Sequence, residues 1–264
     1  MKQWTLLILN TATLLFTLLV NYLVGANNLT GASVGEISDK YDNLFTPAGY
    51  AFAIWGVIYF LLVVFVIYQW VAWIKQRDDE YLNRTGIWFI LSNLANAAWI
   101  IVWTSDMIGL SLVIIIFLFI SLLVLVFRLR LEVWDAPVRV IAFVWWPICI
   151  YIGWIVAASL ANFASYTVSI NPENGIALQP GWAIFMIVAA LLIYVLFIYF
   201  RNMREAAIVG VWALIAIAVK QFDVAVSVSY VAITASVILL VYISIQANKN
   251  KNTSPFYKLK RGEF

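Results

Sequence analysis

Residues 86–103 read GIWFILSNLANAAWIIVW, an apolar run that nevertheless contains Asn93 and Asn96. A run of about 20 mostly apolar residues is long enough to cross the hydrocarbon core of a bilayer as a helix. An amide side chain that faces lipid without a hydrogen-bond partner costs about 2–7 kcal/mol. The two asparagines must therefore face other protein groups, water or a ligand, and this segment is expected to lie within a bundle of membrane helices.

The rest of the chain has the same character. Hydrophobic residues make up 65% of the 264 residues and charged residues 11%, and the mean hydropathy is +0.96. This composition lies far outside that of soluble globular domains, and the alternating pattern of a β-barrel is absent. The expected fold is all-α, a polytopic membrane helix bundle of about eight transmembrane helices, at residues 3–24, 47–74, 86–103, 108–127, 138–164, 181–200, 206–219 and 224–247.

The distribution of charge predicts the orientation of this bundle. With eight spans, every Lys and Arg except Lys40 and Lys220 falls on the side of the membrane that holds both termini. Basic residues concentrate on the cytoplasmic side of membrane proteins. We therefore expect a multi-pass protein of the cell membrane with both termini in the cytoplasm. The net charge of +3 is then a topology signal, and nucleic acid is not an expected partner.

Missing residue types exclude several kinds of site. The chain has no histidine, which excludes His-ligated haem, His–metal sites and His acid–base catalysis. Its one cysteine, Cys149, excludes an intrachain disulfide and any cysteine-cluster metal site. The sequence also offers no nucleophile–base pair and no paired carboxylates, so we predict no catalytic residue and no metal ligand.

Polar and aromatic residues recur at one depth in three of the predicted helices. Helical spacing places Ser92, Asn96, Trp99 and Trp103 on one face, at i, i+4, i+7 and i+11. The segments at 47–74 and 138–164 offer further side chains near the same outer end: Trp55, Tyr59, Trp154 and Asn162.

These side chains have two interpretations. They can line a shared ligand cavity, or they can join the helices as small and polar residues commonly do in membranes. The residues alone leave both open. Asn93 lies about 90° away from this face, so we expect it to bond a neighbouring helix. The long outer loop at residues 25–46 is a candidate lid.

Several motifs resemble the tryptophan-rich sensory protein or translocator protein family. The stretch TPAGYAFAIWGVIY (46–59) is similar to its proline-led second helix, and NAAWIIVW (96–103) is similar to its N-x-x-W third helix. GLSLV (109–113) resembles the start of its fourth helix, and WIVAASLAN (154–162) has the spacing from Trp to Asn found in its fifth. The likeness covers roughly residues 1–165 and leaves the last three segments unmatched.

The resemblance implies a five-helix bundle, often dimeric, with a lid-covered pocket for porphyrins and other flat hydrophobic molecules. Residues 1–165 would form this bundle, 166–247 would add a three-helix membrane segment, and 248–264 would be a basic cytoplasmic tail, which we expect to be solvated. Carried over by position, the residues in the pocket would be Trp55, Asn96, Trp99, Trp154 and Asn162, with residues 25–46 as the lid.

The leading hypothesis is a membrane-embedded binding or sensory protein for a tetrapyrrole-like ligand, in a pocket open to the outer side. The candidate ligand-binding residues are Trp55, Tyr59, Ser92, Asn96, Trp99, Trp103, Trp154 and Asn162. No resident cofactor is expected beyond a porphyrin as ligand, and a homodimer is possible.

Three alternatives stay open: a small-molecule transporter, a regulatory membrane subunit without a ligand, and light-driven or oxidative breakdown of a bound porphyrin. Transporters usually carry intramembrane charge. Lys220 and Asp223 are the candidates here, and we interpret them as an ion pair at the membrane interface.

Overall fold

The computed structural model describes residues 2–26, 29–75, 80–172 and 178–262. Every regular element within these ranges is helical, which confirms the predicted all-α class. A helix occupies each of the eight predicted segments: α1 (Gln3–Asn21), α3 (Ile54–Ile74), α5 (Trp88–Thr104), α6 (Ile108–Arg128), α8 (Trp146–Ile170), α9 (Pro180–Arg201), α10 (Arg204–Gln221) and α11 (Val226–Lys249).

Short elements extend or connect these long helices. They are η1 (Tyr22–Ala26), α2 (Val34–Lys40), η2 (Gly49–Ala53), α4 (Glu80–Thr85), α7 (Val138–Val140), η3 (Ile141–Trp145), η5 (Lys251–Thr253) and α12 (Pro255–Lys260). The wide π-helical turn η3 lies immediately before Pro147, which cannot donate the hydrogen bond of a regular helix. Helical structure thus continues from Val138 to Ile170.

Among the described residues, six helical segments have the length and apolar composition of membrane spans. They are Gln3–Gly25, Gly49–Ile74, Ile108–Arg128, Val138–Ile170, Pro180–Arg201 and Val226–Lys249. The helix α5 is apolar but has only 17 residues. Charged residues stand at both ends of α10: Arg204 and Glu205 at its start and Lys220 near its end. The count of eight spans therefore stays a prediction.

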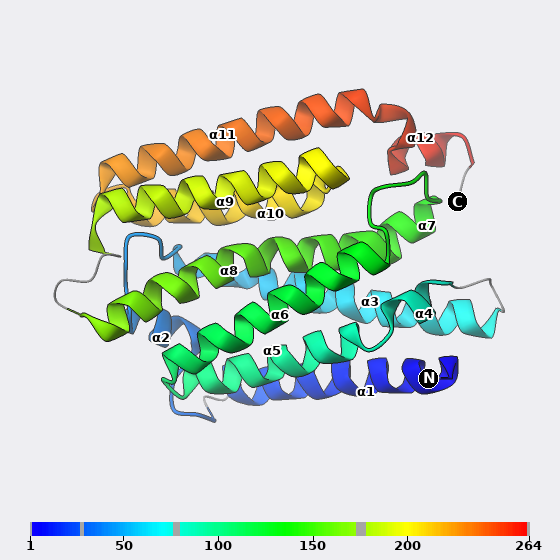
Figure 1. Cartoon of the computed structure of the whole chain (residues 1–264), viewed down its shortest axis with the longest axis horizontal. Helices are drawn as coiled ribbons and strands as arrows, with labels where there is room; N and C mark the ends of the chain where they lie inside the picture. Colours follow the sequence, from blue (N-terminus) through cyan, green and yellow to red (C-terminus); the bar gives the residue numbers. More distant parts are fainter. Residues whose placement is uncertain (1, 27–28, 76–79, 173–177, 263–264) are drawn as a thin grey trace.

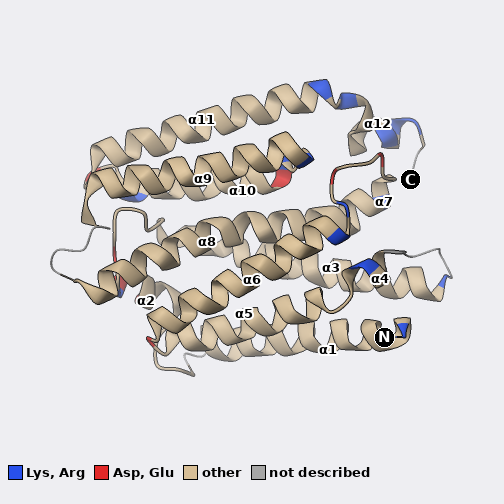
Figure 2. Ribbon diagram, viewed as in Figure 1, with Lys and Arg blue, Asp and Glu red and all other residues tan. Residues whose placement is uncertain are grey.

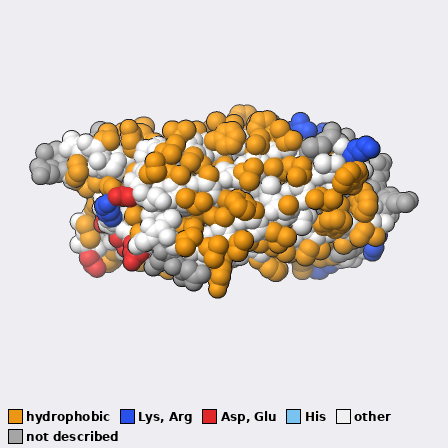
Figure 3. All heavy atoms as spheres, turned by 90° about the horizontal axis from the view of Figure 1, so that it is seen from below, with side chains coloured by type: hydrophobic (Ala, Val, Ile, Leu, Met, Phe, Trp, Pro, Cys, Tyr) orange, Lys and Arg blue, Asp and Glu red, His pale blue; other side chains and the backbone are white. Residues whose placement is uncertain are grey.

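The long helices run along the long axis of the molecule and place both termini at one end (Figure 1). We call this the terminal end, and the opposite end, where α2 lies, the lid end. Most basic residues gather at the terminal end (Figure 2), whereas hydrophobic side chains cover the middle of the face in Figure 3. This banded surface is that of a protein embedded in a bilayer.

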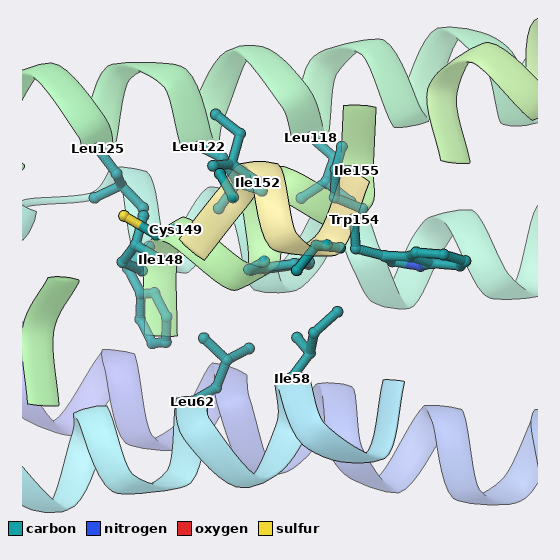
Figure 4. Packing of buried hydrophobic residues seen from close by; sticks show 14 of the residues in the cluster. Ile58, Leu62, Leu118, Leu122, Leu125, Ile148, Cys149, Ile152, Trp154 and Ile155 are labelled. Atoms are coloured by element: carbon teal, nitrogen blue, oxygen red, sulfur yellow. The ribbon is translucent and has the colours of Figure 1, made fainter. Parts of the chain in front are cut away.

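The helix α8 is the centre of the packing. It contacts α3, α6, α9 and α10. In an apolar 18-residue stretch of Val138–Ile170, the segment that contains α8, 78% of the residues are buried, against 28–39% in the other five candidate spans. Figure 4 shows Ile148 and Ile152 of α8 between side chains of α6 and α3. The helices α9, α10 and α11 contact one another and bury a second cluster, to which α8 contributes Val156, Ala164 and Val168.

Two segments differ from the predicted division of the chain. The boundary predicted at residue 165 falls inside α8, which continues to Ile170 and packs against the helices on both sides of it. The prediction of a solvated tail is wrong at Lys258, whose side chain is 2% exposed. Its ammonium pairs with Asp135 and donates a hydrogen bond to the Ala136 carbonyl (2.6 Å), so α12 lies against the protein.

The close approach of α8 and α10 depends on Gly153, which has no side chain. A Cβ atom added at Gly153 would lie 2.7 Å from the Ala206 carbonyl oxygen, which is backbone and cannot rotate away. The same region holds the Tyr194 hydroxyl, which donates to the Gly153 carbonyl (2.8 Å). Gly153 therefore joins α8 to both α9 and α10.

We predict that Gly153→Ala lowers the thermal unfolding temperature in detergent, because overpacking costs about 1–3 kcal/mol. The matched control is Gly56→Ala in α3, where an added Cβ meets no atom within 4 Å. That change should keep or raise stability, since Ala favours a helix over Gly by about 1 kcal/mol. Equal unfolding temperatures for the two variants would contradict the close packing.

Candidate functional site

A cavity lined mainly by aromatic and small side chains lies at the lid end; we call it the aromatic cavity. Five of the predicted site residues line it: Trp55, Trp99, Trp103, Trp154 and Asn162. Indole rings from α3, α5 and α8 meet there. The ring centroids of Trp55 and Trp99 are 6.0 Å apart, those of Trp55 and Trp154 are 6.3 Å apart, and Trp103 stacks on Trp99 at 5.8 Å.

The spacing of small residues explains why α8 leaves room at this position. Ala157, Ala158 and Ala161 line the cavity on the side of α8, so the rings of other helices lie close to its backbone. The free space is nevertheless only about 30 Å³, far below the roughly 150 Å³ of a cavity that admits benzene. In this conformation the aromatic rings fill most of the site themselves.

Asn162 fixes the orientation of one of these rings. Its Oδ1 accepts a hydrogen bond from Trp99 Nε1 (2.9 Å), and its Nδ2 donates to Ser111 Oγ of α6 (3.1 Å). One amide thus links α5, α6 and α8. Because both of its ends are bonded, Asn162 can hold the Trp99 indole in one rotamer at the cavity wall.

Asn96 lies outside the aromatic cavity lining and forms a separate hydrogen-bond hub. Its Oδ1 accepts from Asn21 Nδ2 (2.9 Å), and its Nδ2 donates to the Tyr151 hydroxyl (2.9 Å). Tyr59 OH donates to Asn21 Oδ1 (2.7 Å). The hub therefore joins α1, α3, α5 and α8, and the interpretation of Asn96 as helix glue is the one its contacts favour.

The remaining predicted polar residues are also bonded to the protein. Ser92 donates to the Phe89 carbonyl of its own helix (2.9 Å). Asn93 Nδ2 donates to Thr13 Oγ1 of α1 (3.3 Å), which confirms that Asn93 bonds a neighbouring helix. The Tyr59 ring stacks on the Trp55 indole with centroids 5.5 Å apart, so Tyr59 packs against a ring that lines the cavity.

Sequence reasoning missed the residues that other segments contribute to the aromatic cavity. Phe52 comes from η2, before α3, and Ala213 and Ile217 come from α10. Trp212 is the neighbour of Ala213, but its indole faces elsewhere and donates to the Ala51 carbonyl (3.1 Å). The spacing of residues in the sequence does not indicate that α10 packs beside α3, α5 and α8.

The loop at residues 25–46, which we call the lid after that prediction, contributes to the cavity and is anchored on two sides; its residues 27–28 lie outside the described part of the chain. Val34, Ser38 and Phe45 of this loop line the cavity. On the α5 side, Trp103 Nε1 donates to the Val34 carbonyl (3.2 Å) and Lys40 forms an ion pair with Asp106.

A second anchor joins the lid to α10. Lys220 lies 2.8 Å from an Asp42 carboxylate oxygen and 3.4 Å from one of Asp39. The predicted pairing of Lys220 with Asp223 is therefore wrong, because the ammonium pairs with two carboxylates of the preceding loop instead. Hydrogen bonding to Lys40 lowers the pKa of Asp106, so the Lys40–Asp106 pair is fully ionised at neutral pH.

These contacts predict that Asn96 stabilises the helix packing and does not line the aromatic cavity. Two substitutions in α5 test this role. Asn96→Leu leaves Asn21 and Tyr151 without their amide partner and should cost about 1–3 kcal/mol of stability. Ser92→Ala removes only a bond within the same helix and should be nearly neutral. Thermal unfolding of the two variants in detergent checks the difference, and an unperturbed Asn96→Leu protein would contradict the hub.

Among the described residues, no group of three or more His, Cys, Asp or Glu side chains could hold a metal ion. A family model described as TSPO-like protein matches residues 7–245. This match extends past the expected likeness at 1–165 and includes α9, α10 and most of α11. No curated protein and no solved structure matches the chain. The chain belongs to the TSPO-like protein family.

Proposed function

We propose that this membrane protein binds a flat hydrophobic ligand of the tetrapyrrole class in the aromatic cavity, beneath the lid. The observation that carries the proposal is the convergence of four indoles, Trp55, Trp99, Trp103 and Trp154, from three helices at one end of the bundle. Aromatic walls stack on planar ligands, and a small number of polar groups orient them.

The lid accounts for the small free volume. A porphyrin is far larger than about 30 Å³, so binding must displace some of the cavity's own side chains. Val34, Ser38 and Phe45 belong to the lid and can leave together, whereas Trp99 is fixed by Asn162 and Trp154 is 1% exposed within α8. The ligand would therefore replace the lid side chains against a wall of indoles that stays in place.

Orientation in the membrane completes the proposal. The basic terminal end would face the cytoplasm, which places the lid end and its cavity at the outer side. Four charged residues of the lid end, Lys40, Asp39, Asp42 and Lys220, form ion pairs that anchor the lid. This assignment favours a ligand-binding protein over a transporter, because it leaves these charges a structural role.

Titration of the purified protein with protoporphyrin IX, followed by quenching of tryptophan fluorescence, tests this function. Saturable quenching is expected, and Trp55→Phe or Trp154→Phe should weaken affinity by about 3- to 10-fold, since aromatic contacts contribute about 0.5–1.5 kcal/mol. Trp73→Phe, at the other end of α3, is the control and should keep full affinity. Linear quenching without saturation, or equal losses in all three variants, would reject the proposal.

The Lys40–Asp106 pair should slow entry of the ligand. Asp106 has a positive φ of 66°, which asparagine tolerates well, so Asp106→Asn removes the charge and keeps the backbone. We expect porphyrin to associate about two- to fivefold faster, the scale expected from one exposed ion pair. Stopped-flow fluorescence measures the rate, with Asp223→Asn as the control; the same rate in both variants would show that this pair does not hold the lid.

A further inference from the structure

A second cavity, of about 200 Å³, lies at the terminal end and differs in character from the aromatic cavity. We call it the polar chamber and define it by six of the residues that line it: Glu132, Trp134, Trp145, Asn202, Arg204 and Glu205. Figure 2 shows acidic segments at the start of α10 and in the loop before α7, the two parts of the chain that meet here.

The walls of the polar chamber are built from ordered contacts. The reversal between α9 and α10 is tight because Asn202 adopts a left-handed conformation with φ 55°. Asn250 Nδ2 donates to Asn202 Oδ1 (3.1 Å), which brings the end of α11 over this turn. The buried Lys258 ties α12 to Asp135, so the C-terminal segment closes one side of the chamber.

Buried polar atoms around this chamber lack protein partners. The acceptors are Glu132 Oε1 and Glu205 Oε2, and the donors are Arg204 Nε, Trp134 Nε1 and Trp145 Nε1. Trp145 is 2% exposed, so bulk water does not reach its indole. A buried polar atom without a hydrogen bond destabilises the protein. An occupant that both donates and accepts hydrogen bonds would satisfy the two sets together.

The charges of the chamber point to an occupant without net charge. Among the described residues, Arg204 forms no ion pair with Glu132 or Glu205, although it influences both carboxyls electrostatically. Burial, and then repulsion by Glu205, raise the pKa of Glu132 to about 9. At neutral pH Glu132 is therefore protonated. Burial also raises the pKa of Glu205, whereas the positive charge of Arg204 lowers it, so one carboxylate, that of Glu205, faces the Arg204 guanidinium.

The volume limits the size of the occupant. A dry cavity of about 150 Å³ admits benzene, with its six heavy atoms, so about 200 Å³ admits a molecule of about eight. A bare metal ion does not fit the donor set, since a guanidinium and two indole N–H groups cannot coordinate a cation.

We propose that the polar chamber is a binding site for a small zwitterion of the amino-acid class. Its ammonium group would donate to the free oxygens of Glu205 and Glu132, and its carboxylate would accept from Arg204 and the Trp145 indole. The site lies at the opposite end of the bundle from the aromatic cavity and does not depend on the function proposed for that cavity.

The test uses the full-length protein in detergent at pH 7 and isothermal titration calorimetry. The probes are glycine, alanine and valine, compared with choline as a cation alone and propionate as an anion alone. We expect at least one amino acid to bind saturably, and choline and propionate to bind at least tenfold more weakly. Arg204→Gln and Glu205→Gln should each weaken amino-acid binding at least tenfold.

A matched control makes the test specific. Lys249→Gln removes a positive charge from the same end without touching the chamber, and it should bind like the unaltered protein.

The proposal is overturned if no amino acid binds saturably, or if choline or propionate binds as tightly, which would mean that the chamber holds only water or a simple ion. Unchanged affinity in both Arg204→Gln and Glu205→Gln would also overturn it. The comparison of probes on the unaltered chain decides the question even where a variant fails to fold.

Discussion

Hydrogen bonding of buried amides is the constraint on which the arrangement of the helices depends. Asn96 joins α1, α3, α5 and α8, and Asn162 joins α5, α6 and α8. A third amide pair, Asn10 Nδ2 to Gln69 Oε1 (3.0 Å), links α1 with α3. In hydrocarbon a rotation of any of these helices would expose an amide without a partner. The amides therefore fix which face of each helix points inward. The positions of the indoles on these helices are fixed as a result.

The two ends of the bundle offer sites of different chemistry. At the lid end, Asn96 and Asn162 are hydrogen-bonded within the protein, and the aromatic cavity has mainly apolar walls. At the terminal end, side-chain atoms of Glu132, Arg204 and Glu205 are buried without hydrogen-bond partners. One end is thus suited to a flat hydrophobic molecule and the other to a small polar one. The helix α10 contributes to both sites, through Ala213 and Arg204.

Hydropathy predicted the helices. Helical spacing together with the family resemblance gave eight candidate site residues, and five of these line the aromatic cavity. They failed where the partner of a residue comes from a distant segment. The face of α5 that carries Asn96 was predictable, but Asn21 and Tyr151 as its partners were not, because periodicity carries no information on which helices are neighbours. The same limit applies to Lys220, which pairs with Asp42, and to Lys258, which pairs with Asp135.

We propose that a fixed wall of indoles receives a flat ligand when the lid moves away. An experimental structure of the protein in complex with protoporphyrin IX would test this proposal. We expect the macrocycle to lie against Trp55, Trp99 and Trp154, with the Trp99–Asn162 hydrogen bond intact and Val34 and Phe45 displaced. A macrocycle bound on the lipid-facing surface, or a complex in which the indoles move and the lid stays, would contradict it.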